Sequence, residues 1–197
     1  MIEIRIHGRG GQGAVVASLI LARAAHHQGW EVQVFPEFGV ERRGAPVTAF
    51  ARLDRQPIYL RSKVYEPDHV IVFDPGLKES IDVTAGLKDN GWILVNTSSP
   101  PEAIRNLERF RPATIDATGI AAKYKIGTAT APIVNTTMVG AFAGVSGLFS
   151  MESVAAGIRE TIQGPAAALN IAAASEAYQV CAGPSRPPVE AETGIRQ

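Results

Sequence analysis

The sequence predicts an α/β fold, a three-layer sandwich around a mixed, mostly parallel sheet that is followed by a helical C-terminal segment. Short apolar runs alternate with helical patterns through residues 2–125, a glycine-rich turn joins the first run to the first helix, and three Ala- and Gly-rich helical patterns follow residue 132. With 197 residues, 46% of them hydrophobic, the chain is long enough to bury one sizeable core. We expect a single domain over residues 1–182 and an extended, proline-rich tail over residues 183–197.

The first half of the chain predicts a sheet with strands in both directions. An apolar strand over residues 2–7 leads into a helix over residues 14–28, which ends at Gly29, and a second strand over residues 32–35 completes a βαβ-like step. Residues 47–53 form the next strand, and after a turn at residues 54–57 we expect residues 58–60 to pair back with it as a hairpin. A hairpin among parallel strands makes the sheet mixed.

Further strands are predicted over residues 70–73, 92–95 and 114–116, with helical sequence between the first two. Ser99, Pro100 and Glu102 have the spacing of a capping box, which predicts a helix that continues to about Phe110. A short helical stretch is expected at residues 118–125. Three helices follow over residues 133–149, 150–162 and 165–181, and the small residues of the first should allow close backbone approach: Gly140, Ala143, Gly144 and Gly147.

The turn after the first strand has the residues of an anion-binding site. Its glycines match the GxGxxG pattern of Rossmann-like dinucleotide-binding folds, in which backbone N–H groups at a helix start face a pyrophosphate. Tight packing of the strand on the helix is the alternative explanation of these glycines. The residues concerned are Gly8, Arg9, Gly10, Gly11, Gln12 and Gly13.

The second part of a nicotinamide-binding pattern is weak in this chain. Glu37 is the one acidic candidate for the ribose at the end of the second strand, and a long loop with Arg42 and Arg43 follows it. The two arginines suit an anionic ligand, and they suit equally well a solvated surface loop or the carboxylates of a partner chain.

Composition and side-chain spacing argue against several classes of function. Formal net charge is zero, so nothing global predicts binding to nucleic acid, although residues 1–63 hold nine Lys and Arg against five Asp and Glu. Cys181 is the sole cysteine, which excludes an iron–sulfur cluster held by this chain alone. The histidines lack metal-ligand spacing; for His7 we expect a backbone carbonyl as partner, and Asp74 before Pro-Gly is typical of a turn. We expect no catalytic residue, no membrane insertion and a cytoplasmic protein.

Three segments together resemble a known family: IHGRGGQG, then FGVERRGAPVTAFARLDRQPI, and later APIVNTTMVGAFA. Over about residues 2–180 the chain resembles the gamma subunit of 2-oxoacid:acceptor oxidoreductases, the pyruvate:ferredoxin oxidoreductase family. The resemblance implies a complex that oxidatively decarboxylates a 2-oxoacid to its acyl-CoA and passes electrons to ferredoxin or NAD. It implies thiamine diphosphate, Mg and 4Fe-4S clusters on partner subunits, namely alpha, beta and a ferredoxin-like delta subunit, with an NAD-reducing subunit in some members.

The resemblance also implies that this chain helps to bind coenzyme A and to assemble the complex. Coenzyme A phosphates would lie on the glycine turn, with help from Arg42, Arg43, Asn135 and Thr136; Asn135 and Thr136 equally suit the N-cap of a helix. RGAPV at residues 43–47 favours a pyruvate-like acid, but aromatic acids fit as well, and the acid stays open. Two other functions remain: a stand-alone Rossmann-type NAD-binding dehydrogenase, and a purely architectural subunit.

Overall fold

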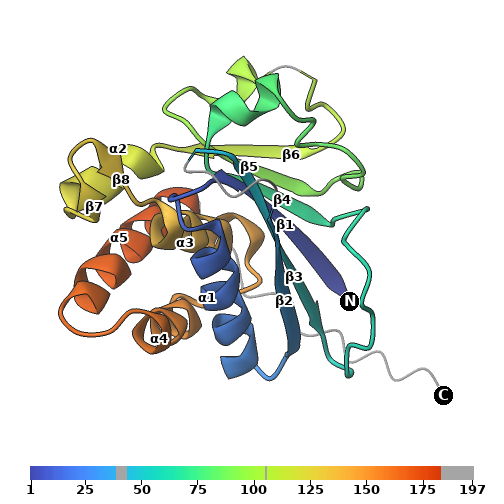
Figure 1. Ribbon diagram of the computed structural model, residues 1–197, viewed down its shortest axis with the longest axis horizontal. Helices are drawn as coiled ribbons and strands as arrows, with labels where there is room; N and C mark the ends of the chain where they lie inside the picture. Colours follow the sequence, from blue (N-terminus) through green and yellow to red (C-terminus); the bar gives the residue numbers. More distant parts are fainter. Residues whose placement is uncertain (39–43, 105, 183–197) are drawn as a thin grey trace.

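The structure, a computed structural model, describes residues 1–38, 44–104 and 106–182. Its centre is a six-stranded sheet with the order β2-β3-β1-β4-β5-β6 (Figure 1). β1, β4, β5 and β6 are mutually parallel, and β3 runs antiparallel to both β1 and β2, so the predicted mixed, mostly parallel sheet is confirmed. The strands are β1 (Ile2–Arg9), β2 (Glu31–Phe38), β3 (Pro46–Asp54), β4 (His69–Val72), β5 (Trp92–Asn96) and β6 (Arg111–Ile115).

The first three strands include a βαβ step with one strand inserted. β1 and β2 each pair antiparallel with β3 and therefore run in the same direction, joined by α1 (Ala14–His27). α1 ends before Gly29, whose φ of +74° is the left-handed conformation that suits the residue after a helix. Because β3 is paired on both edges, the expected hairpin with residues 58–60 is wrong, and those residues form no strand.

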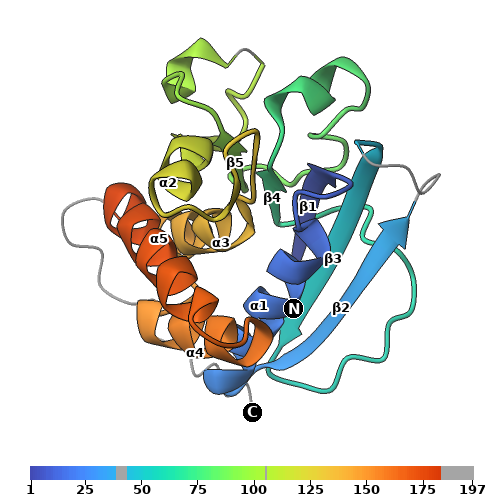
Figure 2. The ribbon, with the colours of Figure 1, turned by 60° about the vertical axis from the view of Figure 1, so that its left-hand side comes forward.

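Helices cover one face of the sheet. This face carries α1 together with α3 (Asn135–Ser146), α4 (Met151–Thr161) and α5 (Ala166–Cys181) (Figure 2). The last three confirm the three helices predicted for the C-terminal segment. α2 (Ala117–Lys123) and a small hairpin of β7 (Gly127–Thr128) and β8 (Ala131–Pro132) connect β6 to α3. The main core fills the space between these helices and the sheet, and its fully buried side chains include Ile4, Ile6, Leu21, Ile71 and Phe142.

α3 and α5 approach each other closely through glycine, as their composition predicts. A methyl group at Gly140 would lie 2.1 Å from the backbone oxygen of Ala174, and one at Gly144 would lie 2.6 Å from that of Tyr178. Only a residue without a side chain fits at such distances. The small residues of α3 therefore serve packing within this chain.

No α-helix of the described residues covers the opposite face of the sheet. The β4–β5 connection holds one 3₁₀-helix, η1 (Pro75–Glu79), where helical sequence was expected, and the capping-box region holds only η2 (Pro101–Ala103). The helix expected to reach Phe110 is thus wrong: Asn106 has a φ of +64°, which no α-helix contains, and Leu107 is buried in a second apolar cluster with Val72 and Leu77. Burial of Leu107 against this face outweighs the local capping signal.

Candidate functional site

The site lies where the direction of the strand connections reverses. From β1 the chain crosses over the helical face to β2, whereas from β4 it crosses over the opposite face to β5. Open α/β sheets form a crevice at such a point, outside the carboxyl ends of the two strands. In this chain the glycine turn after β1 and the segment Asp74-Pro75-Gly76 after β4 lie at this point.

Two motifs that the sequence places about thirty residues apart meet at this point. Gly10 N–H donates to the carbonyl of Ala45 at 2.9 Å, and Gly44 N–H donates to the carbonyl of Gly10 at 3.2 Å. The turn also closes on itself, because Arg9 N–H donates to Gln12 Oε1 at 2.8 Å. The glycine turn and the loop before β3 therefore form one surface. Arg42 and Arg43 lie outside the described residues.

The start of α1 presents unpaired backbone donors at this surface. Gly13 is the N-cap, with a φ of +82° that strongly favours glycine, and no side chain caps the helix or places an acidic group in its first turn. The first N–H groups of an α-helix have no partner within the helix, and its dipole adds partial positive charge there. Gly11, exposed with a φ of +97°, leaves open space beside these donors.

The start of α3 packs directly beneath the start of α1. Asn135, the first residue of α3, is buried, and a methyl group on Gly13 would lie 2.8 Å from its Nδ2. Thr136 is fully buried and donates its hydroxyl to Asn170 Oδ1 at 2.8 Å, while its N–H donates to Asn135 Oδ1 at 2.7 Å. Val134 is the N-cap, so neither Asn135 nor Thr136 takes that position. Two helix N-termini thus converge on Gly13, at the place where the resemblance puts Asn135 and Thr136 together with the glycine turn.

Arg9 connects the glycine turn to the segment after β4 and to the loop before β3. Its Nε donates to Asp74 Oδ2 at 2.6 Å, and its Nη1 donates to the Gly44 carbonyl at 3.2 Å. Asp74 also accepts from Gly76 N–H at 2.9 Å, so it forms the turn that Asp-Pro-Gly predicts. Arg9 neutralises the carboxylate of Asp74 and fixes the turn against both neighbouring loops. No sequence pattern predicts this pair, because its members are 65 residues apart.

His7 ends β1 just before the glycine turn, and its surroundings differ from the expectation. It is 5% exposed, and neither ring nitrogen has a hydrogen-bond partner among the described residues, so the expected backbone carbonyl is wrong. Burial lowers the pKa of His7 to about 4, with the positive charge of Arg5 acting in the same direction. The imidazole is therefore neutral at physiological pH and contributes no positive charge to the site.

Glu37 does not lie beside the glycine turn. β3 separates its strand from β1, and its carboxylate pairs with Lys63. This position does not match a ribose-binding carboxylate, which requires a second strand adjacent to the first.

Neither a metal-binding cluster nor a reactive thiol is present among the described residues. No cluster of three or more His, Cys, Asp or Glu side chains there has the arrangement of a metal site. Burial raises the pKa of Cys181 to about 11, so its thiol stays protonated. Among the helices of the described residues, none combines the length and apolar character needed to span a bilayer.

Known proteins share both the sequence and the fold of this chain. The profile of the family "Pyruvate ferredoxin/flavodoxin oxidoreductase" matches residues 3–180. The pyruvate/ketoisovalerate oxidoreductases common subunit gamma of Thermococcus kodakarensis is 52% identical over 181 residues, covering 90% of this chain and 96% of the relative. Pyruvate synthase subunit PorC of Methanocaldococcus jannaschii is 52% identical over 178 residues, with 90% and 96% coverage.

Solved structures agree. The pyruvate oxidoreductase subunit PORC from Thermotoga maritima superposes with a TM-score of 0.75 at 35% identity, covering 90% of this chain and 95% of that one. A 2-oxoglutarate:ferredoxin oxidoreductase from Magnetococcus marinus has a TM-score of 0.74 at 18% identity and shows the fold alone; it covers 92% of this chain but only 31% of its own, so there the fold is part of a longer polypeptide. This chain belongs to the pyruvate ferredoxin/flavodoxin oxidoreductase family, as one of its gamma subunits.

Proposed function

We propose that this gamma subunit binds the phosphates of coenzyme A at the glycine turn, within a complex that oxidatively decarboxylates a 2-oxoacid to its acyl-CoA. The observation that carries the proposal is the meeting of two helix N-termini at Gly13, neither of which has an acidic side chain in its first turn. Coenzyme A carries a diphosphate and a further phosphate, and helix N-termini with free N–H groups are favourable sites for such anions.

The backbone groups of the glycine turn and the side chains at the start of α3 have separate roles in this proposal. The N–H groups around Gly11 and the start of α1 donate to phosphate oxygens, and the open space at Gly11 lets the ligand reach them. Asn135 and Thr136 hold the start of α3 beneath Gly13 rather than contacting the ligand through the Thr136 hydroxyl, which is occupied by Asn170. A role for Arg42 and Arg43 in binding coenzyme A is supported by the resemblance alone.

Arg9 acts chiefly by removing a repulsion. Without its guanidinium, the carboxylate of Asp74 would stand unpaired at the edge of the anion site, and like charges at short range disfavour binding. The Arg9–Asp74 pair is about one quarter to one third exposed, so solvent screening moderates the effect.

Carbon–carbon bond cleavage and electron transfer belong to other subunits in this proposal. The described residues of this chain hold no His, Cys, Asp or Glu cluster that could bind a metal, and the partly buried Cys181 thiol stays protonated. We assign thiamine diphosphate with Mg, and the 4Fe-4S clusters that carry electrons, to the alpha, beta and delta partners; thiamine diphosphate would supply the carbanion chemistry of decarboxylation. A pyruvate-like acid and a ferredoxin acceptor fit the similarity to pyruvate oxidoreductase subunits best.

The experiment that tests the proposal measures the KM for coenzyme A in the assembled complex. Arg9→Ala should raise this KM about tenfold, because it removes a cation and exposes Asp74. Arg9→Ala combined with Asp74→Asn should recover part of the loss, since the second change removes the exposed charge. Arg109→Ala, at a solvent-exposed pair with Asp89, is the matched control and should leave KM unchanged. An Arg9→Ala complex with native KM would contradict the proposal.

A further inference from the structure

Three of the seven exposed large apolar side chains of the described residues, including the two most exposed, lie on one irregular segment. Residues 55–66, called here the tyrosine segment, follow β3 and run along the side of the sheet away from the helices (Figures 1 and 2). Tyr59 is 84% exposed, Tyr65 70% and Leu60 47%, and the rest of the described chain has only four other exposed large hydrophobics. Aromatic residues that gather on a surface mark a protein interface more often than an unused one.

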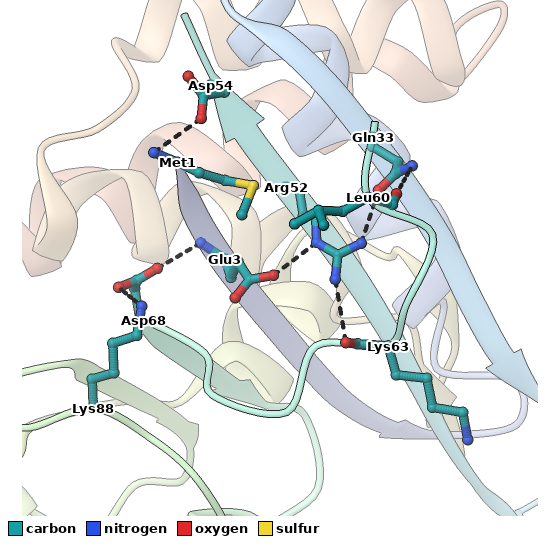
Figure 3. A network of polar contacts seen from close by, with 9 residues as sticks. All are labelled: Met1, Glu3, Gln33, Arg52, Asp54, Leu60, Lys63, Asp68 and Lys88. Atoms are coloured by element: carbon teal, nitrogen blue, oxygen red, sulfur yellow. Dashed lines mark hydrogen bonds and ion pairs between the residues drawn. The ribbon is translucent and has the colours of Figure 1, made fainter. Parts of the chain in front are cut away.

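A buried arginine holds this segment in place. Arg52 of β3 is 1% exposed; it donates to Glu3 Oε1 at 2.7 Å and to the carbonyl of Lys63 at 3.2 Å. Gln33 of β2 accepts from Arg52 and donates to the carbonyl of Leu60 at 2.8 Å (Figure 3). Two backbone carbonyls of the tyrosine segment are thus tied to the sheet by side chains that are themselves fixed. Such a loop exposes its tyrosines without conformational freedom of its backbone, which lowers the entropic cost of binding.

Its far end is fixed as well. Val64 is 3% exposed, and the carbonyl of Tyr65 lies so close to Gly86 that a methyl group there would be 2.0 Å from the oxygen. The segment is therefore anchored on both sides of its exposed apolar residues. Rigid aromatic side chains on a fixed backbone have the properties of binding hot spots.

A hollow of about 440 Å³ lies between the tyrosine segment and the edge strand β2. Its lining combines aromatic rings, aliphatic side chains and one arginine: Gln33, Val34, Phe35, Ile58, Tyr59 and Arg61. Its size is that of a pocket for one or two large side chains of another protein. Pro36 of β2 has no N–H to donate, which makes this edge less suited to the addition of a strand and favours binding through side chains.

The charges of the segment indicate which kind of partner fits. The tyrosine segment carries three basic side chains, Arg55, Arg61 and Lys63, and one acidic side chain, Glu66. Arg55 stacks on Trp30, with its guanidinium 3.9 Å from the ring centre, and Lys63 pairs with Glu37. Arg61 is exposed and has no ion pair among the described residues. A second copy docked across a two-fold axis would place this basic segment against itself, which electrostatics disfavours.

We propose that the tyrosine segment and β2 form the docking surface for another subunit of the oxidoreductase. That subunit inserts an apolar side chain into the hollow beside Tyr59 and presents a carboxylate to Arg61. The inference rests on membership of this chain in a multisubunit oxidoreductase, and it is independent of where coenzyme A binds. The glycine turn and the tyrosine segment lie at different parts of the sheet, because the turn follows the carboxyl end of β1 whereas the segment follows the end of the antiparallel β3.

The first test is site-specific photocrosslinking in the native complex. A benzoylphenylalanine placed at Tyr59 should crosslink to a different subunit, whereas the same group at Leu169, an exposed position on α5, is the control for nonspecific capture. A crosslink from Tyr59 to a second copy of this chain would overturn the proposal. So would the absence of any crosslink in complexes that retain all subunits.

The second test is a charge reversal. Arg61→Glu should raise the dissociation constant of this subunit from the complex about tenfold, and Tyr59→Ser should act in the same direction. Arg159→Glu reverses another exposed arginine, on α4, that has no ion pair among the described residues, and it should leave assembly unchanged. Complexes with Arg61→Glu that still form should retain their native KM for coenzyme A, so failure of this proposal is distinguishable from failure of the coenzyme A site. Native affinity of both Arg61→Glu and Tyr59→Ser would overturn the docking surface.

Discussion

Replacing Gly13 by alanine should destabilise the protein through two separable effects. The φ of +82° costs a residue with a side chain about 1–2 kcal/mol. The new methyl group would also lie 2.8 Å from Nδ2 and 3.1 Å from Cβ of Asn135, and crowding of a buried side chain adds roughly 1 kcal/mol or more. A total of about 2–3 kcal/mol corresponds to a melting temperature roughly 4–12 °C lower for a chain of this size.

Thermal unfolding followed by circular dichroism measures this loss, and two further variants separate its parts. Gly11→Ala has the same backbone strain, at a φ of +97°, but its methyl group meets nothing within 4 Å, so it should cost only about 1–2 kcal/mol. Gly13→Ala combined with Asn135→Ala should show a favourable coupling, because the contact of the new methyl group with Nδ2 is gone and only the contact with Cβ at 3.1 Å remains. If Gly13→Ala melted no lower than Gly11→Ala, the contact between the starts of α1 and α3 would be refuted.

Three further changes test other parts of the structure. Gly140→Ala places a methyl group 2.1 Å from a carbonyl of α5 and should cost about 3 kcal/mol in urea unfolding, more than Gly157→Ala at 2.8 Å from a carbonyl of α1; the reverse order would contradict the packing. The pKa of His7 is about 4 in the folded protein against 6.5 for the free side chain, so neutral His7 stabilises the fold above pH 6.5 and this contribution is lost as the pH falls. At pH 5 the loss is about 2 kcal/mol. His7→Phe should therefore reduce the difference in unfolding free energy between pH 7.5 and pH 5. Glu3→Gln leaves the buried guanidinium of Arg52 without a counter-charge and should cost about 3 kcal/mol, a value that a loss below 1 kcal/mol would disprove.

Much of the fold follows from local patterns. The apolar runs that became β1, β3, β4, β5 and β6 are bounded by Gly, Pro and Asp, and these signals are short-range. The glycines of α3 predicted a close helix contact, and the structure places α5 there. In each of these cases the energetic preference lies within the segment itself.

Where prediction failed, tertiary contacts had outweighed a local preference. Residues 58–60 have strand-forming side chains, but both edges of β3 were already paired, and the carbonyl of Leu60 binds Gln33 instead. Ser99 begins a capping-box pattern, yet its benefit of about 1 kcal/mol is smaller than the burial of Leu107 against the sheet.

For the candidate site, the sequence indicated which motifs to consider, but it did not predict the hydrogen bonds and ion pairs between their residues. The glycine turn, its helix and the second motif were all identified, but the hydrogen bonds between Gly10 and Ala45 depend on the register of β1 with β3. Arg9 was predicted as a coenzyme A-binding residue, and the structure adds its ion pair with Asp74. Contacts between residues this far apart in the chain are set by topology, which no single motif encodes.

Hydrogen–deuterium exchange of the assembled complex, with and without saturating coenzyme A, shows directly whether the glycine turn binds the phosphates of coenzyme A. Binding of the phosphates by the turn predicts slower exchange of the amides of Gly11 and of residues 13–16, because these N–H groups have no acceptor among the described residues until the ligand accepts them. Slowed exchange confined to other subunits, with these five amides unchanged, would contradict it.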